Sequence, residues 1–468
     1  MLRDHAAPPV ARVRALEQAW SEAEGGERDR APTRAVLKDL VWDGNTPEQV
    51  RLPALQTLLD DTSPEGQADS RRMAILMLPT ERDRTATALL SAAAARHGWT
   101  DATAALVRSY ARPLEGIPDA DRPEREALRR LHPGRDLAEI VYGVFVDPQT
   151  DPGPGDLRLD ERARLDAWEL LSRLHETRGR REELLRAALP EDAGADARRL
   201  RSVLLATFDQ FGVLPSRAAE TRWAASLAEQ GSPAAQRWWR EAGEAAGRLG
   251  PGQREGLELR HVEPVRWADE HRPQWLDASA AELESQLRGR LEGREHVRRT
   301  AENAPTRKDA TEKLGDWIDE LVWGDLLSIL VLDEAVRSEA VVRSVAEYAR
   351  LDRADRATEY GGLIEVAPEG DGFRAVLFQP RTRDRGNDYR FVASDDMIRY
   401  SDRALAHFHM HVQRDNNRRI AGPSPGDLAY TAWSGRNCIV FTSVREGQMN
   451  VDYYQPNGAV IDLGLIGG

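Results

Sequence analysis

Three histidines on alternate positions constrain this chain more than any other feature. His407, His409 and His411 lie two apart within five residues, and a β-strand sends every second side chain to the same face. Two histidines spaced in this way are ~7 Å apart at Cα and can converge on one ion, because zinc binds imidazole nitrogen at ~2 Å. The spacing therefore predicts a metal-binding strand.

The sequence Gly-Pro-Ser-Pro-Gly-Asp, residues 422–427, follows the histidines. Asp427 could supply a third ligand, and three protein ligands with one open position are typical of catalytic zinc. The same residues predict a helix start with Ser424 as N-cap and Pro425 in the first turn. The two interpretations are compatible, because an aspartate in a first helical turn can face a metal. A serine-hydrolase elbow is excluded because Pro425 has no N–H for the oxyanion hole.

A general base is expected upstream of the histidines, where Glu359 precedes the apolar segment Gly361–Ile364. The alternative is that these residues only turn the chain into a strand. Together, E-x-x-G-x-[LI], H-x-H and S-x-x-D resemble the JAMM (JAB/MPN) metalloprotease family, whose members are zinc isopeptidases. The resemblance covers about the last third of the chain.

The resemblance implies a role for each matched residue. Glu359 would be the general base, His409, His411 and Asp427 the zinc ligands, and Ser424 the residue that helps to hold the oxyanion. His407 with His409 is an equally good H-x-H pair. The later pair is preferred because Phe408 then precedes the first ligand, as in family members, so His407 is expected to be buried outside the ligand set.

The chain departs from the family pattern at two points after the histidines. The family has proline where this chain has Val412, and its spacing between the second histidine and the serine is shorter. The additional residues are polar and fall within Gln413–Arg419, in the loop Gln413–Ala421. We interpret them as a loop insertion that governs specificity, so that shortening it would change substrate choice more than fold.

The composition excludes several classes of protein. A net charge of −13 argues against a general nucleic-acid or anionic-membrane binder. The single cysteine, Cys438, excludes disulfide frameworks and cysteine-based zinc sites. The apolar run Leu326–Leu332 is too short to span a bilayer, and residues 1–5 hold no apolar signal segment. We therefore expect a cytoplasmic protein.

Periodicity predicts a multidomain chain. Residues 1–150 read as short helices similar to HEAT-like repeats, which would bind a protein partner, and a Pro/Gly-rich break follows at 147–156. Residues 151–328 are expected to form a second all-α region. Residues 329–468 are expected to form a JAMM-like α/β domain with the metal at a sheet edge. Its expected strands are Leu363–Val366, Phe373–Gln379, Tyr389–Val392, Leu405–Val412, Cys438–Val444, Met449–Tyr454 and Val460–Leu465, with a helix at Asp427–Trp433.

The function that follows is zinc-dependent cleavage of a peptide or isopeptide bond in an extended tail, such as a ubiquitin-like one. A sheet-edge site could pair with such a tail as a strand. A non-catalytic helical scaffold carrying an MPN-like domain is the alternative, and a zinc hydrolase of a small molecule is a third. The terminal Gly467–Gly468 matches the ending of ubiquitin-like modifiers, although a frayed end is the commoner reason for such a pair.

Overall fold

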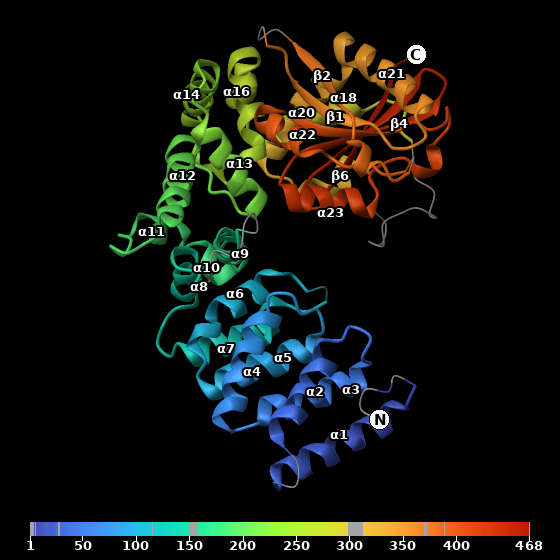
Figure 1. Cartoon of the computed structure of the whole chain (residues 1–468). Helices are drawn as coiled ribbons and strands as arrows, with labels where there is room; N and C mark the ends of the chain where they lie inside the picture. The colour runs from blue at the N-terminus through green and yellow to red at the C-terminus, as the bar shows by residue number, and fades with distance from the viewer. Residues whose placement is uncertain are drawn as a thin grey trace. The chain divides into compact units, whose positions relative to one another are not determined.

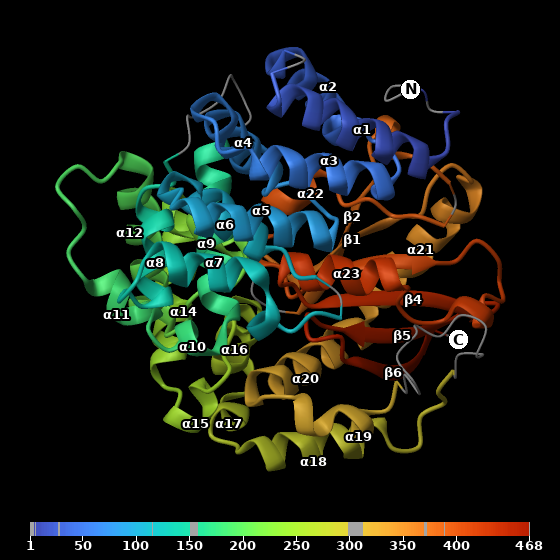
Figure 2. The same cartoon turned by 90° about the horizontal axis from the view of Figure 1, so that it is seen from below.

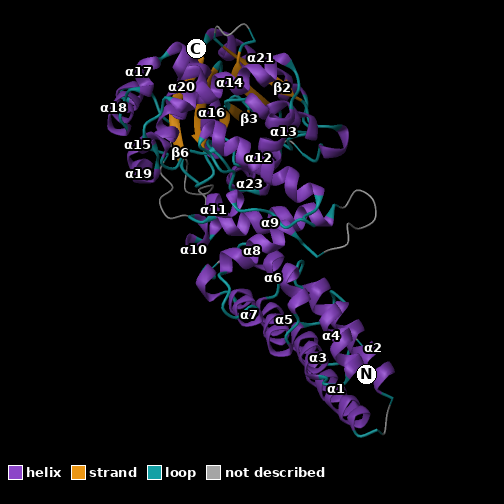
Figure 3. Cartoon of the chain, turned by 90° about the vertical axis from the view of Figure 1, so that its left-hand side faces the viewer, coloured by secondary structure: helices purple, strands orange, loops and turns teal. Residues whose placement is uncertain are grey.

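The computed structural model describes residues 4, 6–26, 29–114, 116–149, 158–297, 312–368, 372–387 and 389–467. The chain divides into two compact units, unit 1 (Met1–Arg199) and unit 2 (Leu200–Gly468). Within the described ranges, all strands belong to unit 2 (Figure 3). The division into three domains stays a prediction. Most of the 147–156 break and Gly468 fall outside the described residues.

Unit 1 is built from helices, which confirms the expected helical N-terminal region (Figure 1). Its helices are α1 (Pro9–Glu24), α2 (Arg30–Trp42), α3 (Glu48–Asp60), α4 (Pro64–Met77), α5 (Arg84–His97), α6 (Thr103–Ala111), α7 (Pro123–Leu131), α8 (Leu137–Val146), α9 (Leu159–Arg173), α10 (His175–Arg178) and α11 (Arg181–Arg186). Side chains of Ser63 and three aspartates cap α2, α4, α5 and α8. Each helix packs on near neighbours, for example α1 on α3 and α3 on α5. That they are HEAT-like repeats stays a prediction.

Unit 2 combines helices with one sheet. Helix α12 (Ala195–Phe211) spans the boundary between the units. The helices that follow are α13 (Ala218–Glu229), α14 (Pro233–Gly247), α15 (Pro251–Arg254), α16 (Val262–His271), α17 (Pro273–Leu276), α18 (Ala280–Leu291), α19 (Leu314–Trp317), α20 (Trp323–Arg337), α21 (Glu339–Ala354), α22 (Asp395–Tyr400) and α23 (Pro425–Ser434). No helix in the described part of either unit is both long and apolar enough to cross a membrane.

The sheet has six strands in the order β2-β1-β3-β4-β5-β6. The strands are β1 (Gly361–Val366), β2 (Phe373–Phe378), β3 (Ala406–His411), β4 (Cys438–Arg445), β5 (Gln448–Tyr454) and β6 (Val460–Gly467). Strand β3 runs antiparallel to β1 and parallel to β4, and the remaining pairs are antiparallel. Figure 2 shows β4, β5 and β6 side by side, with α23 close to β4. The mixed α/β architecture is confirmed.

Two details of the predicted sheet are wrong. Residues 389–392 form no strand and join no ladder of the sheet; the Glu359 N–H donates to the Arg390 carbonyl oxygen at 3.4 Å. The histidine strand β3 is interior rather than at an edge, since both β1 and β4 bond to it. Neither side of β3 is therefore free to pair with a substrate as a strand beside the metal.

One hydrophobic core joins the sheet to the helices of the expected middle region. Phe408 and Met410 of β3 belong to the same buried cluster as residues of α16, α18, α20 and α21. Helix α20 is apolar nearly all round, and a helix of this kind is stable only when other elements surround it. The apolar segment Leu326–Leu332 of α20, which is too short to span a membrane, therefore lies at the centre of the unit 2 core.

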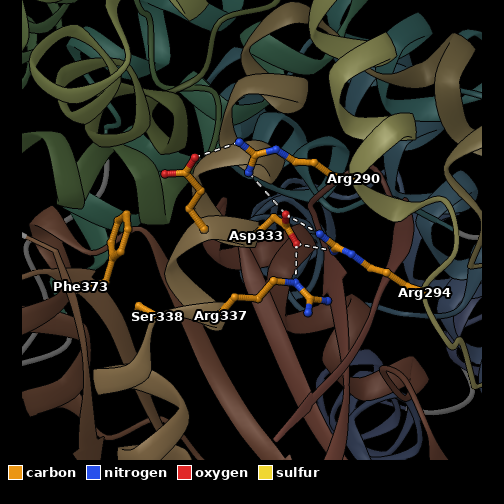
Figure 4. Close-up of a pocket in the computed structure, with 7 residues that line it drawn as sticks. Arg290, Arg294, Asp333, Arg337, Ser338 and Phe373 are labelled. Carbon is orange, nitrogen blue, oxygen red and sulfur yellow. Dashed lines mark hydrogen bonds and ion pairs between the residues drawn. The ribbon is translucent and has the colours of Figure 1, made fainter.

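A cluster of arginines ties the last strand to this central helix. The Asp333 carboxylate of α20 forms ion pairs with Arg294 at 2.6 Å and with Arg337 at 3.2 Å. The three residues line a cavity of about 390 Å³ (Figure 4). The same two arginines donate to the carbonyl oxygens of Leu463 and Leu465 in β6. These charge-assisted bonds hold β6 against α20.

A second, buried ion pair joins Arg260 to the central helix α20 of unit 2. Arg260 Nη2 lies 2.6 Å from Asp325 Oδ1, with side chains 4% and 2% exposed, and His261 Nε2 contacts the same oxygen at 2.8 Å. Asp325→Ala would leave Arg260 buried without this partner, so we expect a loss of ~3–5 kcal/mol in unfolding free energy. Urea denaturation measures this loss. Asp319→Ala, an exposed control, should unfold like the wild type, and a wild-type midpoint for Asp325→Ala would contradict the prediction.

Candidate metal centre

The three histidines lie on one face of β3, as the alternation predicts. Phe408 and Met410 point into the apolar core, and the histidines occupy the opposite face. His409 and His411 are 4% and 7% exposed. Backbone bonds from β1 and β4 fix this strand on both sides, so the positions of the imidazole groups are set by the sheet.

Two imidazole nitrogens face each other at the spacing of ligands that share a metal. His409 Nε2 lies 3.2 Å from His411 Nε2 and 3.4 Å from Asp427 Oδ2. Ligand atoms that bind one zinc tetrahedrally at ~2.0–2.1 Å are ~3.3–3.4 Å apart. The His409–His411 and His409–Asp427 separations therefore match those of ligands that share one zinc ion.

The second ring nitrogens of the two histidines have their own partners. His411 Nδ1 lies 2.8 Å from the carbonyl oxygen of Ile420, and His409 Nδ1 lies 3.4 Å from the hydroxyl of Tyr454. Because a carbonyl oxygen only accepts, Nδ1 of His411 carries the proton and Nε2 keeps its lone pair. Such outer hydrogen bonds are typical of metal-binding histidines.

Glu359 lies beside the histidines, two residues before β1. Its side chain is 3% exposed, and Oε1 lies 3.9 Å from His411 Nε2. Glu359, His409 and His411 each offer a ligand atom within 4.8 Å of the others. Burial raises the pKa of Glu359 to about 7 although His409 lowers it, and a value near neutrality is one that general bases have.

The glycines after Tyr360 allow the chain to pass close to its neighbours. A Cβ at Gly361 would lie 2.5 Å from the carbonyl oxygen of Phe408, and one at Gly362 would lie 1.9 Å from that of Val376. A side chain at either position would push β1 away from β3 or β2. The Glu-Tyr-Gly-Gly sequence thus turns the chain into a strand and also brings Glu359 to the histidines.

Asp427 and Ser424 form the predicted helix start. Ser424 Oγ accepts from the Asp427 N–H at 3.3 Å, and Asp427 Oδ2 accepts from the Ser424 N–H at 2.6 Å, a reciprocal capping box. Burial raises the pKa of the Asp427 carboxyl, but His409, His411 and the Ser424 N–H together lower it more, so that it lies well below its usual range. The capping geometry directs this ionised carboxylate toward His409.

The electrostatics of the cluster favour a cation. Burial lowers the pKa of His409, yet Asp427 and Glu359 raise it more, so the net shift is upward. A bound metal ion would supply the positive charge that these carboxylates favour.

His407 is buried outside this group. Its Nδ1 lies 2.8 Å from the Tyr430 hydroxyl of α23. Burial, together with the charge of Arg436, lowers the pKa of His407 well below its ordinary value. The ring is therefore neutral and packs against α23 rather than joining His409 and His411.

Three groups near the site were not identified from sequence. Gln413 donates to Glu359 Oε1 at 2.9 Å, Asn417 donates to the His411 carbonyl oxygen at 3.0 Å, and Ile420 provides the carbonyl for the His411 ring. All three belong to the expected insertion. Its polar composition gave no signal that it folds onto the site.

Comparisons with models of known protein families, with curated proteins and with solved structures found no match to this chain. The geometry supports a narrower conclusion. A buried glutamate and two histidines form a group that can bind a metal ion, and Asp427 contacts this group through His409.

Proposed function

We propose that this protein is a zinc-dependent metallopeptidase of the JAMM type, which cleaves a peptide or isopeptide bond. One observation carries the proposal: His409 Nε2 lies 3.2 Å from His411 Nε2 and 3.4 Å from Asp427 Oδ2. These are the separations of ligands around a tetrahedral zinc. The order of the residues along the chain supports the JAMM assignment, since it follows E-x-x-G-x-[LI], H-x-H and S-x-x-D.

Asp427, rather than Glu359, is assigned as the third ligand. The 3.9 Å between Glu359 Oε1 and His411 Nε2 is longer than the ~3.3–3.4 Å expected between two ligands of one zinc. The same oxygen also accepts from Gln413. A carboxylate set back in this way is suited to hold a water molecule beside the metal, which is the place of a general base.

The chain's own residues would then move the proton and hold the charge. Zinc, when bound, supplies a Lewis acid that lowers the pKa of water and polarises a carbonyl group. Glu359 would take the proton of the attacking water and return it to the leaving amine. Ser424 accepts a hydrogen bond as N-cap, and its hydroxyl hydrogen can be donated to the developing oxyanion.

The substrate class and the partner follow from the resemblance. We propose an extended tail, such as a ubiquitin-like one, as the substrate, and unit 1 as the part that selects a substrate or partner protein. The proposal does not use strand pairing at the metal, since β3 is an interior strand.

Metal analysis and a peptide-library digest test the function together. Purified protein should carry about one zinc per chain, and a chelator should abolish cleavage that added zinc restores. One zinc without cleavage of any peptide or isopeptide would favour the scaffold alternative or a small-molecule hydrolase. Absence of metal from protein reconstituted with zinc would contradict the proposal.

A further inference from the structure

We propose that Gln413, Asn417 and the carbonyl group of Ile420 are positioning groups of the metal centre. In this view they hold the His411 ring and the Glu359 carboxylate in place, which goes beyond the specificity role expected from the sequence. The inference rests on the proposed function only in taking His409 and His411 as the residues that hold the ion.

The Ile420 carbonyl sets the proton on His411. It accepts from Nδ1 at 2.8 Å, which leaves the Nε2 lone pair directed at His409 Nε2, 3.2 Å away. A ring without this partner could place its proton on Nε2, or rotate, and either change would remove one ligand. The hydrogen bond therefore selects the metal-binding form of the ring.

Gln413 sets the direction of the Glu359 carboxylate. The Gln413 amide donates to Oε1 at 2.9 Å, and this carboxylate is 3% exposed. Because the residue is buried, water competes little for this hydrogen bond, which directs Oε1 toward Gln413. Glu359 is thereby held beside His411 instead of rotating away from it.

Asn417 holds both ends of the segment in place. Its backbone N–H donates to the Ser443 carbonyl oxygen of β4 at 2.7 Å. Its side-chain amide donates to the His411 carbonyl oxygen at 3.0 Å and reaches Gln413 Oε1 at 3.4 Å. Asn417 is only 8% exposed, so these bonds are shielded from competing water.

An arginine outside the segment fixes it to unit 2. Arg353 of α21 donates to the Val412 carbonyl oxygen and to Ser443 Oγ, both at 2.8 Å, and pairs with Asp415 at 2.9 Å. The segment is thus bonded to α21, to β4 and to the histidine strand. By contrast, Arg414 and Asn416 at its tip are exposed and are the part that a substrate could reach.

The test compares Asn417→Ala, Gln413→Met and the exposed control Arg414→Ala in the full-length protein. Zinc affinity is measured by competition with a chromophoric chelator, and the ligand geometry by the visible absorption of bound Co²⁺. Asn417→Ala should weaken zinc binding by about 10–100-fold and change the Co²⁺ spectrum, because the segment that carries the Ile420 carbonyl loses the side-chain bond that ties it to β3. Arg414→Ala should match the wild type in both measurements.

Gln413→Met should separate the two roles. It removes the hydrogen bond to Glu359, which is not a ligand, so zinc affinity should be unchanged. Turnover of a peptide found in the library digest should fall by about 10–100-fold in kcat, with KM unchanged. Melting temperatures of both variants show whether a loss reflects unfolding.

The outcomes distinguish this inference from the proposed function. A wild-type Co²⁺ spectrum and zinc affinity in Asn417→Ala would overturn the positioning role, even if the wild-type protein is an active peptidase. Conversely, a wild-type protein that binds zinc but cleaves nothing would overturn the peptidase assignment. The Asn417→Ala measurement would still decide the role of the segment in that case.

Discussion

Glu359→Gln should leave zinc content and melting temperature nearly unchanged while lowering the rate of hydrolysis by ~10²–10⁴-fold. The substitution keeps the size of the side chain and an oxygen that can accept from Gln413. It removes only the ability to take a proton, since a neutral amide is not a base at neutral pH. Steady-state kinetics, metal analysis and thermal melting on the same preparations measure the three quantities.

The matched control is Glu446→Gln, an exposed carboxylate in the turn before β5, which should behave as the wild type does. If Glu359 only starts a strand, its variant should retain full activity, and unaltered turnover would sink its assignment as the base. If the protein is a scaffold, neither form should cleave a substrate, while partner binding should be unaffected.

His409→Ala should abolish stoichiometric zinc binding, whereas His407→Ala should retain it. His409 Nε2 lies close to both other proposed ligand atoms, at 3.2 Å from His411 Nε2 and 3.4 Å from Asp427 Oδ2. His407 contacts Tyr430 instead. Loss of one ligand from a three-ligand site removes a third of its protein–metal bonds, so the expected effect on affinity is large. Metal analysis after dialysis against zinc measures the effect.

Both histidines are buried, so circular dichroism and thermal melting should accompany the metal analysis. Loss of zinc in His407→Ala together with its retention in His411→Ala would show that the ligand pair is His407 and His409. Asp427→Ala should also lose zinc, and because Asp427 closes the capping box of α23, it should lose some stability as well.

The sequence predicted those parts of the site that depend on local chain geometry. Alternation places His409 and His411 on one face of a strand because the side-chain period of a strand is two. Ser424 and Pro425 mark a helix start because each satisfies the backbone of the first turn. Both features lie where they were expected, and what they do chemically stays a prediction.

The outer groups of the site could not be predicted in the same way. The Ile420 carbonyl is a backbone group, so its contact with His411 is not indicated by the residue type at that position. Gln413 and Asn417 reach Glu359 and His411 only because their segment folds back over β3, and polar composition is equally common in exposed loops. Tertiary contacts of this kind have no local sequence pattern.

The wrong strand at Tyr389–Val392 has a related cause. Aromatic and β-branched residues such as Tyr389, Phe391 and Val392 predict an extended chain, but a strand also needs a partner strand within reach. The Glu359 N–H donates to the Arg390 carbonyl oxygen, yet residues 389–392 join no strand of the sheet. Local propensity cannot show whether a partner strand lies within reach.

The interior position of β3 separates folding from metal uptake. In zinc fingers the ion supplies the folding energy, and the metal-free chain is unfolded. Here the ligand strand is fixed by backbone bonds to β1 and β4, so the frame would exist before any ion arrives. Zinc would then act as an exchangeable ligand that adds about 2.7 kcal/mol when its free concentration is a hundred times Kd. A protein built in this way could lose its ion and be reloaded without refolding, and under the proposed function the metal supply alone would switch its activity on and off.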